Sequence, residues 1–383
     1  MMESFIDKFE QHYPDQNTVA FMHRIKQMRF SERVTAFSDL GIDVLTRYQE
    51  ILGMKQKPIG FEKYNKYDSD FNQLMARATR KISEGEADDS ISYLRYLLID
   101  EYQDFSELFY SFVQAVLQRN DRIQLFCVGD TCQAINRFMG ADTMYFDKFS
   151  EFFPLSAHLG LHTNYRSSKT VVDISNQFMQ SYLPAKELAK SVNLTECKCY
   201  FYNIDNTFIA MNSDYYSYEI DSKYKTLLAE KGQDPKLTKY IKTCVELIKK
   251  HRGDKIYFLN RKNLILNYEI TEFMRKIKNL LSEDGWTPSE LNQIEIMTMH
   301  KAKGLQADLV VVLCANVREI PKIHPNNELF EVFDENSKDL LLDEVKLFYV
   351  AITRAKGSFV VLFDDELTTF AKNLNLSELV LDT

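Results

Sequence analysis

Glycine, tryptophan and long apolar runs are all scarce in this sequence. The chain has 383 residues, of which 12 are glycine and one is tryptophan. No apolar run reaches the ~18 residues that a transmembrane helix needs. The polar start MMESFIDKFEQ lacks the apolar core of a signal peptide. These absences argue against a membrane-spanning or secreted protein, and we expect a cytoplasmic one with no membrane partner.

The dipeptide glycine-lysine is missing altogether. A phosphate-binding P-loop needs it, because backbone N–H groups and the lysine together cradle the β- and γ-phosphates of a nucleotide. None of the 12 glycines is followed by lysine. The printed sequence therefore offers no P-loop of its own.

An excess of positive charge is also absent. The net charge is −8, which excludes a general polybasic coat for nucleic acid. A local groove of basic and aromatic residues can still bind a single strand on an acidic protein. The six cysteines are scattered, and the pair Cys197 and Cys199 has no second Cys/His pair at zinc spacing. We expect buried free thiols in a reducing compartment.

The sequence pattern changes near residue 93, from helical segments to alternating strand-like and helical segments. Residues 1–92 show apolar positions at helical spacing and end in the acidic linker EGEADDS. From Tyr93 onward strand-like runs alternate with helical ones, which predicts a parallel α/β sheet. We place two α/β layers on either side of residue 160 and an irregular loop over 203–235. The expected strands are YLLID, RIQLFCVGD, CYFYN, KIYFLNR, IEIMTMH, DLVVVLCAN and SFVVLF.

The stretch YLLIDEYQD, residues 96–104, runs from apolar residues straight into two carboxylates, Asp100 and Glu101. Such a run predicts a parallel strand that is covered on both faces. Ligands of open α/β sheets bind at the carboxyl ends of the strands. An acidic pair there suits Mg²⁺ and phosphate chemistry, with one carboxylate on the metal and its neighbour on a water. The alternative is a core strand that ends in an acidic turn, and this motif alone does not decide.

Two further stretches carry candidate nucleotide-binding or base-stacking side chains. In VGDTCQAINRFMGAD, residues 128–142, Gln133 can point an amide at a phosphate or a water, and Phe138 can stack on a base. LHTNYRSS sets Tyr165, a face for a purine, beside Arg166, a partner for phosphate. The alternatives are a Phe138 ring packed on the core and a structural arginine.

The last two stretches lie near the C-terminal end. TMHKAKGLQAD, residues 298–308, follows a strand and offers a hydroxyl, an imidazole and two lysines to a phosphate. LFYVAITRAKGSFVVLF places Arg354 between an apolar helix and a strand, as an arginine finger requires. The alternatives are ordinary solvated lysines and a cation that complements the helix dipole.

In this order, IDEYQD, VGDxxQxIxRFxGAD, NYRSS, TMHKAKGL and LFYVAITRAK resemble the motifs of UvrD/Rep-type superfamily 1 DNA helicases, and look closest to the helicase IV branch. The resemblance implies an α/β fold with two RecA-like domains of the P-loop NTPase type. The first, residues 93–159, is incomplete and carries residues 1–92 as a helical insert; the second covers residues 160–383. It implies ATP-dependent 3′-to-5′ translocation on single-stranded or partially duplex DNA, with unwinding.

The resemblance also implies a role for each matching side chain, with ATP and Mg²⁺ as cofactors. Asp100 binds Mg²⁺, and Glu101 is the general base for the attacking water. The residues implied to contact the nucleotide are Gln133, Arg166 and Arg354 at the γ-phosphate, Tyr165 at adenine and Gln306 at the ribose. The residues implied to line the single-stranded DNA track are Phe138, Asn136, Arg261, Thr298 and His300.

Departures from the family pattern leave alternatives open. Gln306 replaces a glutamate, Met139 stands where most relatives have arginine, and Asn136 replaces a tyrosine, which removes one base-stacking ring. The missing Walker A region suggests a helicase portion that works with a separately encoded, Walker A-containing piece or is left over from a truncated gene. The second hypothesis is a catalytically inactive, single-stranded DNA-binding or regulatory module. A Mg²⁺ nuclease is a third idea, but no further carboxylate cluster forms a matching motif.

Overall fold

The computed structural model describes residues 71–87, 89–137, 140–183, 188–195, 197–207, 234–323 and 337–379. The chain divides into two compact units. The smaller contains Met1–Tyr93, Ser111–Asp121 and His324–Leu340, and the larger contains the remaining residues. The helices expected before residue 71 and most of the loop expected over 203–235 lie outside the described residues. The division into three domains stays a prediction.

The described start of the smaller unit is helical, as the apolar spacing predicts. Helix α4 (Phe71–Ser83) is followed by the short helix α5 (Ser90–Tyr93). The turn after α4 contains Gly85, whose φ of 76° is a left-handed conformation that glycine adopts without strain. No helix in the described ranges is long and apolar enough to cross a membrane.

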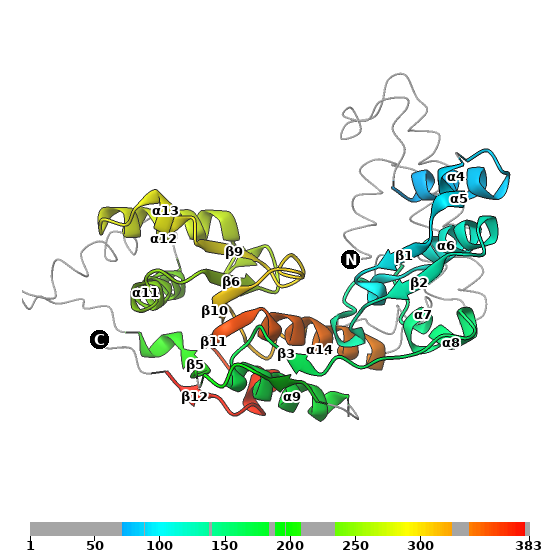
Figure 1. The fold of residues 1–383 in the computed structure, drawn as a ribbon. Coiled ribbons are helices and arrows are strands. Elements are labelled where there is room, and N and C mark those ends of the chain that lie inside the picture. Colours follow the sequence, from blue (N-terminus) through cyan, green and yellow to red (C-terminus); the bar gives the residue numbers. More distant parts are fainter. Residues whose placement is uncertain are drawn as a thin grey trace, which may run out of the picture. The chain divides into compact units, whose positions relative to one another are not determined.

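The first sheet belongs to the larger unit and confirms the β-α-β prediction. Strands β1 (Tyr96–Ile99) and β2 (Gln124–Cys127) run parallel and are connected through helix α6 (Glu107–Arg119) (Figure 1). Their register places Ile99 opposite Cys127, so the two strands end side by side.

The prediction that this first strand is covered on both faces is wrong. Tyr96 is 67% exposed, Leu98 is 70% exposed and Phe126 of β2 is 58% exposed, whereas Leu97 and Ile99 are half-buried. Successive side chains of a strand point to opposite faces, so one face of this sheet is covered and the other is open. In the described part of the chain, β1 has only β2 as a hydrogen-bonded neighbour.

The second sheet, also in the larger unit, has six parallel strands in the order β12-β5-β11-β10-β6-β9. The strands are β5 (Tyr200–Asn203), β6 (Ile256–Asn260), β9 (Ile294–Thr298), β10 (Ala307–Val312), β11 (Ala355–Phe363) and β12 (Ser377–Glu378). Each strand expected from the sequence after residue 197 is present. The continuous apolar runs form the central strands, as a sheet covered on both faces requires.

Helices cover both faces of this sheet (Figure 1). Val310 and Val312 of β10 pack with α9 (Lys169–Tyr182) and α14 (Ser337–Thr353). Their neighbours Leu309 and Val311 pack with α11 (Pro235–Lys250) and α12 (Ile270–Glu283).

The shorter elements are α7 (Met144–Asp147), α8 (Phe149–Phe152), β3 (Thr163–Asn164), β4 (Lys190–Ser191), β7 (Leu264–Ile265), β8 (Tyr268–Glu269), α13 (Pro288–Leu291), α15 (Thr369–Lys372) and the 3-10 turns η1 (Tyr102–Asp104), η2 (Thr131–Gln133) and η4 (Ile204–Asn206).

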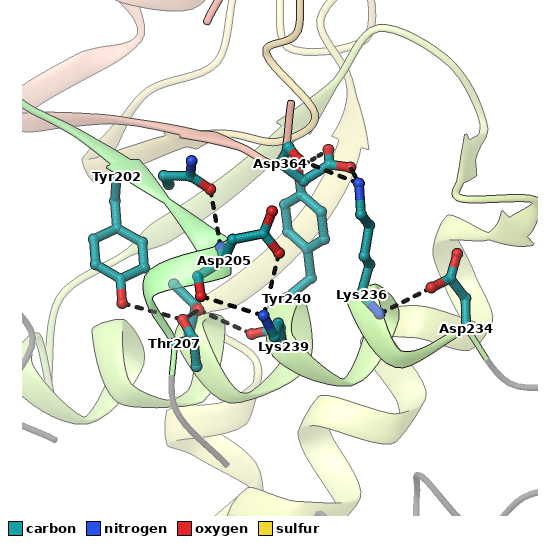
Figure 2. Close-up of polar contacts among 10 residues, drawn as sticks. Tyr202, Asp205, Thr207, Asp234, Lys236, Lys239, Tyr240 and Asp364 are labelled. Atoms are coloured by element: carbon teal, nitrogen blue, oxygen red, sulfur yellow. Dashed lines mark hydrogen bonds and ion pairs between the residues drawn. The ribbon is translucent and has the colours of Figure 1, made fainter. Parts of the chain in front are cut away.

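A buried polar group lies where β11 ends. The Asp364 carboxylate accepts hydrogen bonds from Tyr240 Oη at 2.9 Å, Lys236 Nζ at 3.0 Å and Asn316 Nδ2 at 2.7 Å. Figure 2 shows Tyr240 and Lys236 directed from α11 toward Asp364. Because Asp364 is only 6% exposed, these donors replace the water that its charge would otherwise need. The group joins α11 to the ends of β10 and β11.

Candidate functional site

The acidic pair lies at the carboxyl end of β1. Glu101 adopts a left-handed conformation, with φ 53° and ψ 39°, and its N–H donates to Asp100 Oδ1 at 2.9 Å. For a residue with a Cβ this conformation costs roughly 1–2 kcal/mol, and such outliers gather at functional sites. The turn leaves both Asp100 and Glu101 exposed. Solvent and ligands can therefore reach both carboxylates.

The end of β2 lies beside this turn and holds Gln133. The carboxylate of Asp130 accepts from the backbone N–H of Cys132 at 2.9 Å and from Gln133 Nε2 at 2.8 Å. Gln133 Oε1 in turn accepts from Arg354 Nη2 at 2.9 Å. The structure thus brings together two predicted γ-phosphate contacts that are far apart in the sequence.

Arg354 lies between α14 and β11, as the sequence predicts, and is 2% exposed. Its guanidinium donates to the carbonyl oxygens of Val350 at 3.1 Å and Leu305 at 3.2 Å. Burial and the neighbouring charge of Arg166 lower the pKa of Arg354 to about 10. The side chain is still a cation at neutral pH, and it already contacts the Gln133 amide.

The TMHKAKGL loop also reaches the acidic strand tip. Lys303 Nζ lies 2.6 Å from Asp104 Oδ2 and 4.0 Å from Glu101 Oε2. Asn136 Nδ2 donates to the same Asp104 oxygen at 2.9 Å, while the buried Asp104 Oδ1 has no hydrogen-bond partner. The sequence alone did not reveal that Lys303 and Asp104 pair, because their spacing carries no local signal. Asn136, a predicted DNA contact, here binds a carboxylate.

Tyr165 and Arg166 lie on an anchored turn. Asn164 Oδ1 accepts from the backbone N–H groups of Arg166 and Ser167, both at 2.9 Å. Ser167 Oγ donates to the Ala355 carbonyl oxygen at 2.7 Å, which fixes the turn to the start of β11. The Tyr165 ring is 78% exposed and has room to stack on a base.

The remaining residues that are predicted to contact DNA differ in whether they already bind other side chains or backbone groups of the protein. Arg261 binds Glu344 through Nε at 3.0 Å and Nη2 at 2.5 Å, and Glu344 is only 7% exposed. Burial, and then the charge of Arg261, lower the pKa of His300, so this ring is neutral at pH 7. Thr298 ends β9, where its Oγ1 accepts from the Lys301 N–H at 3.4 Å. Gln306 is exposed, and Phe138 lies outside the described residues.

The donor set at the strand tip fits one kind of metal site. Mg²⁺ is usually held by one or two carboxylates together with substrate phosphates and waters. The exposed Asp100 carboxylate is suited to that role. No group of three or more His, Cys, Asp or Glu side chains that could hold a metal occurs in the ranges that the structure describes. All six cysteines are free thiols.

Comparisons with known proteins point to one family. Residues 4–154 match the UvrD/REP helicase N-terminal domain, and residues 214–365 match the UvrD-like helicase C-terminal domain. DNA helicase IV of Escherichia coli is 28% identical over 305 residues, which are 78% of this chain and 37% of that protein. A probable DNA helicase of Mycoplasma pneumoniae is 28% identical over 263 residues, or 69% of this chain and 42% of that protein. The chain thus spans less than half the length of these relatives.

Proposed function

The chain belongs to the UvrD/Rep-type family of DNA helicases, and we propose that it carries the water- and metal-handling part of an ATP-dependent motor. This motor moves 3′-to-5′ along single-stranded DNA and unwinds partial duplexes. The observation that carries the proposal is the 2.9 Å hydrogen bond between Arg354 and Gln133, close to the acidic tip of β1. It joins motifs that the sequence separates widely.

In the proposed reaction, these side chains act on the γ-phosphate of ATP and on the attacking water. Asp100 holds Mg²⁺, which when bound neutralises phosphate charge. Glu101 orients and deprotonates the water. Gln133 contacts the γ-phosphate, and the cationic Arg354 and Arg166 stabilise the charge that develops on it.

Nucleotide and DNA would meet separate groups of side chains. Tyr165 supplies an exposed ring for adenine, and the exposed Gln306 supplies an amide for the ribose. Thr298 and His300, at the end of β9, contact the single strand. Because His300 is neutral, it would bind a base or a sugar rather than pair with a phosphate as a cation.

The β- and γ-phosphates need a cradle that the printed sequence does not supply, since none of its 12 glycines precedes a lysine. We infer that a Walker A-containing segment comes from elsewhere, either a separately encoded piece or another part of the same gene product. Reading the neighbouring DNA for a frame that encodes GxxxxGK[ST] tests this inference at little cost.

Binding of single-stranded DNA tests the proposed function directly. Fluorescence anisotropy with a labelled oligo(dT) is expected to give micromolar or tighter binding, and weaker binding to blunt duplex. His300→Ala is expected to weaken single-strand binding by about 3- to 10-fold, as lost contacts to a base do. His251→Ala, at the far end of α11, is the matched control and leaves binding unchanged. No binding to either DNA would refute the proposal.

A further inference from the structure

A series of hydrogen bonds, linked through the backbone and side chain of Asp130, leads from Glu101 to Arg354, and the buried Gln103 lies near its start. We propose that Gln103 is a positioning residue, which fixes the Glu101 carboxylate and, through Asp130, orients the Gln133 amide toward Arg354. The catalytic meaning of this arrangement rests on the proposed function, in which Glu101 acts on water. The arrangement itself can be tested without nucleotide or DNA.

Both ends of the Gln103 amide are engaged. Gln103 is 1% exposed, its Nε2 donates to Glu101 Oε2, and its Oε1 accepts from the backbone N–H of Asp130 at 2.9 Å. A side chain at this point must donate on one side and accept on the other, and an amide does both. An ionised glutamate would accept only, and a leucine would leave the partly buried N–H of Asp130 without this acceptor. The chemistry of the two partners thus favours a neutral amide at this position.

Gly129 provides the space that this amide occupies. A Cβ at Gly129 would lie 2.6 Å from Gln103 Oε1 and 3.0 Å from the Gln103 backbone nitrogen. Any other residue here would push the amide away from the Asp130 N–H. The Gly-Asp turn after β2 therefore has two roles: glycine admits Gln103, and Asp130 binds it.

The second half of the chain continues from the Asp130 side chain. Its carboxylate accepts from Gln133 Nε2 at 2.8 Å. With its nitrogen committed there, Gln133 presents Oε1 to the Arg354 guanidinium, which donates at 2.9 Å. Reversing the Gln133 amide would place its N–H groups against those of the Arg354 guanidinium. The Asp130 carboxylate, which can only accept, thus fixes the orientation of the Gln133 amide.

This arrangement restrains a carboxylate whose cationic neighbour, Lys303 Nζ, lies 4.0 Å away. The Glu101 side chain is 52% exposed, and a long exposed side chain samples many rotamers. A hydrogen bond from a buried amide holds it in one direction, as positioning of a water requires. The same chain connects the ends of β1 and β2 to the junction between α14 and β11. A change at Glu101 should therefore be felt at Gln133.

Side-chain amide NMR of chain labelled with ¹⁵N-glutamine tests this connection. Gln103→Leu and Gln133→Leu assign the two signals. We expect the Gln103 amide protons to exchange at least about tenfold more slowly than those of the exposed Gln306. Glu101→Ala should shift the signals of both Gln103 and Gln133. Glu107→Ala, which removes a nearby exposed carboxylate, should shift neither.

Gly129→Ala provides a second variant that leaves Gln103 in the sequence. It is expected to shift the Gln103 signal and to abolish its slow exchange while far-UV circular dichroism stays unchanged. A Gln133 signal that does not respond to Glu101→Ala would overturn the proposal, since a glutamine that only packs the turn has no such effect. Fast exchange at Gln103 in the unmodified chain would overturn it too. A chain that fails to bind DNA but shows these shifts would refute the helicase function alone.

Discussion

Arg354 and Tyr165 are both proposed to contact nucleotide, yet the fold depends on them to different degrees. Arg354 is buried and holds two backbone carbonyl oxygens, whereas Tyr165 is 78% exposed. Arg354→Ala would remove the hydrogen bonds to Val350, Leu305 and Gln133 together with a buried side chain, and should lower the free energy of unfolding by about 3 kcal/mol. Tyr165→Ala should change it by less than about 0.5 kcal/mol. Urea unfolding measures both, and equal effects would contradict the structure.

Asp364 makes the stability of the fold depend on pH. Burial tends to raise its pKa, but hydrogen bonds from Asn316, Lys236 and Tyr240 lower it below the ordinary 3.8. A folded-state pKa below the unfolded value stabilises the fold above the unfolded pKa, and this stabilisation is lost as pH falls through the folded pKa. Asp364→Asn should therefore be less stable than the parent at pH 7, by roughly 1–3 kcal/mol.

The difference in free energy of unfolding between Asp364→Asn and the parent should narrow below about pH 4, because the unfolded parent then takes up a proton that the folded Asp364 binds only at lower pH. Urea midpoints measured between pH 7 and pH 3 follow this change. Asp205→Asn is a suitable control, since its carboxylate pairs with Lys239 but is 47% exposed. A difference between parent and Asp364→Asn that stays constant over this range would contradict the assigned role of the carboxylate.

At the level of elements, the first sheet has one face that is open to solvent. Tyr96, Leu98 and Phe126 present apolar side chains to solvent, which favours self-association. Replacing Leu98 and Phe126 together by serine should reduce concentration-dependent light scattering without loss of stability. Leu264→Ser, at a half-exposed position elsewhere, is the control and should have little effect. Scattering that persists in the double variant would show that this face is not responsible.

The sequence predicted strands and helices well where the pattern is local. Apolar runs such as DLVVVLCAN mark central strands of the six-stranded sheet, and the residue after a strand or helix marks Asp100 and Arg354 as candidates. The exposure of one face of β1 could not be predicted in the same way. An apolar run does not show whether other elements will pack on one face of the strand or on both. That depends on contacts between distant segments.

The same limit applies to partners within the site. The pairing of Lys303 with Asp104 and of Arg261 with Glu344 could not be predicted, since each joins residues that only the tertiary fold brings together. Gln103 lies within the acidic motif, but its role depends on Asp130 at the end of another strand. Local spacing identifies chemically suitable residues, and the fold decides which of them meet.

For the whole molecule, family membership and the missing glycine-lysine dipeptide lead to one account. The described chain assembles the acidic tip, Gln133, Arg354 and the Tyr165 turn. In the proposed function, the cradle for the β- and γ-phosphates would come from a further segment. We therefore expect the chain to bind single-stranded DNA but not to turn over ATP unaided.

Measurement of ATP hydrolysis by the purified chain, with and without oligo(dT), shows whether the chain needs a further segment for turnover. We expect a rate no higher than that of Glu101→Gln prepared in parallel, in the presence or absence of DNA. This variant removes the proposed base and keeps the size of the side chain, so it controls for contaminating enzymes. DNA-stimulated hydrolysis that Glu101→Gln abolishes would contradict the account, because the chain would then hold the phosphates without a Walker A segment.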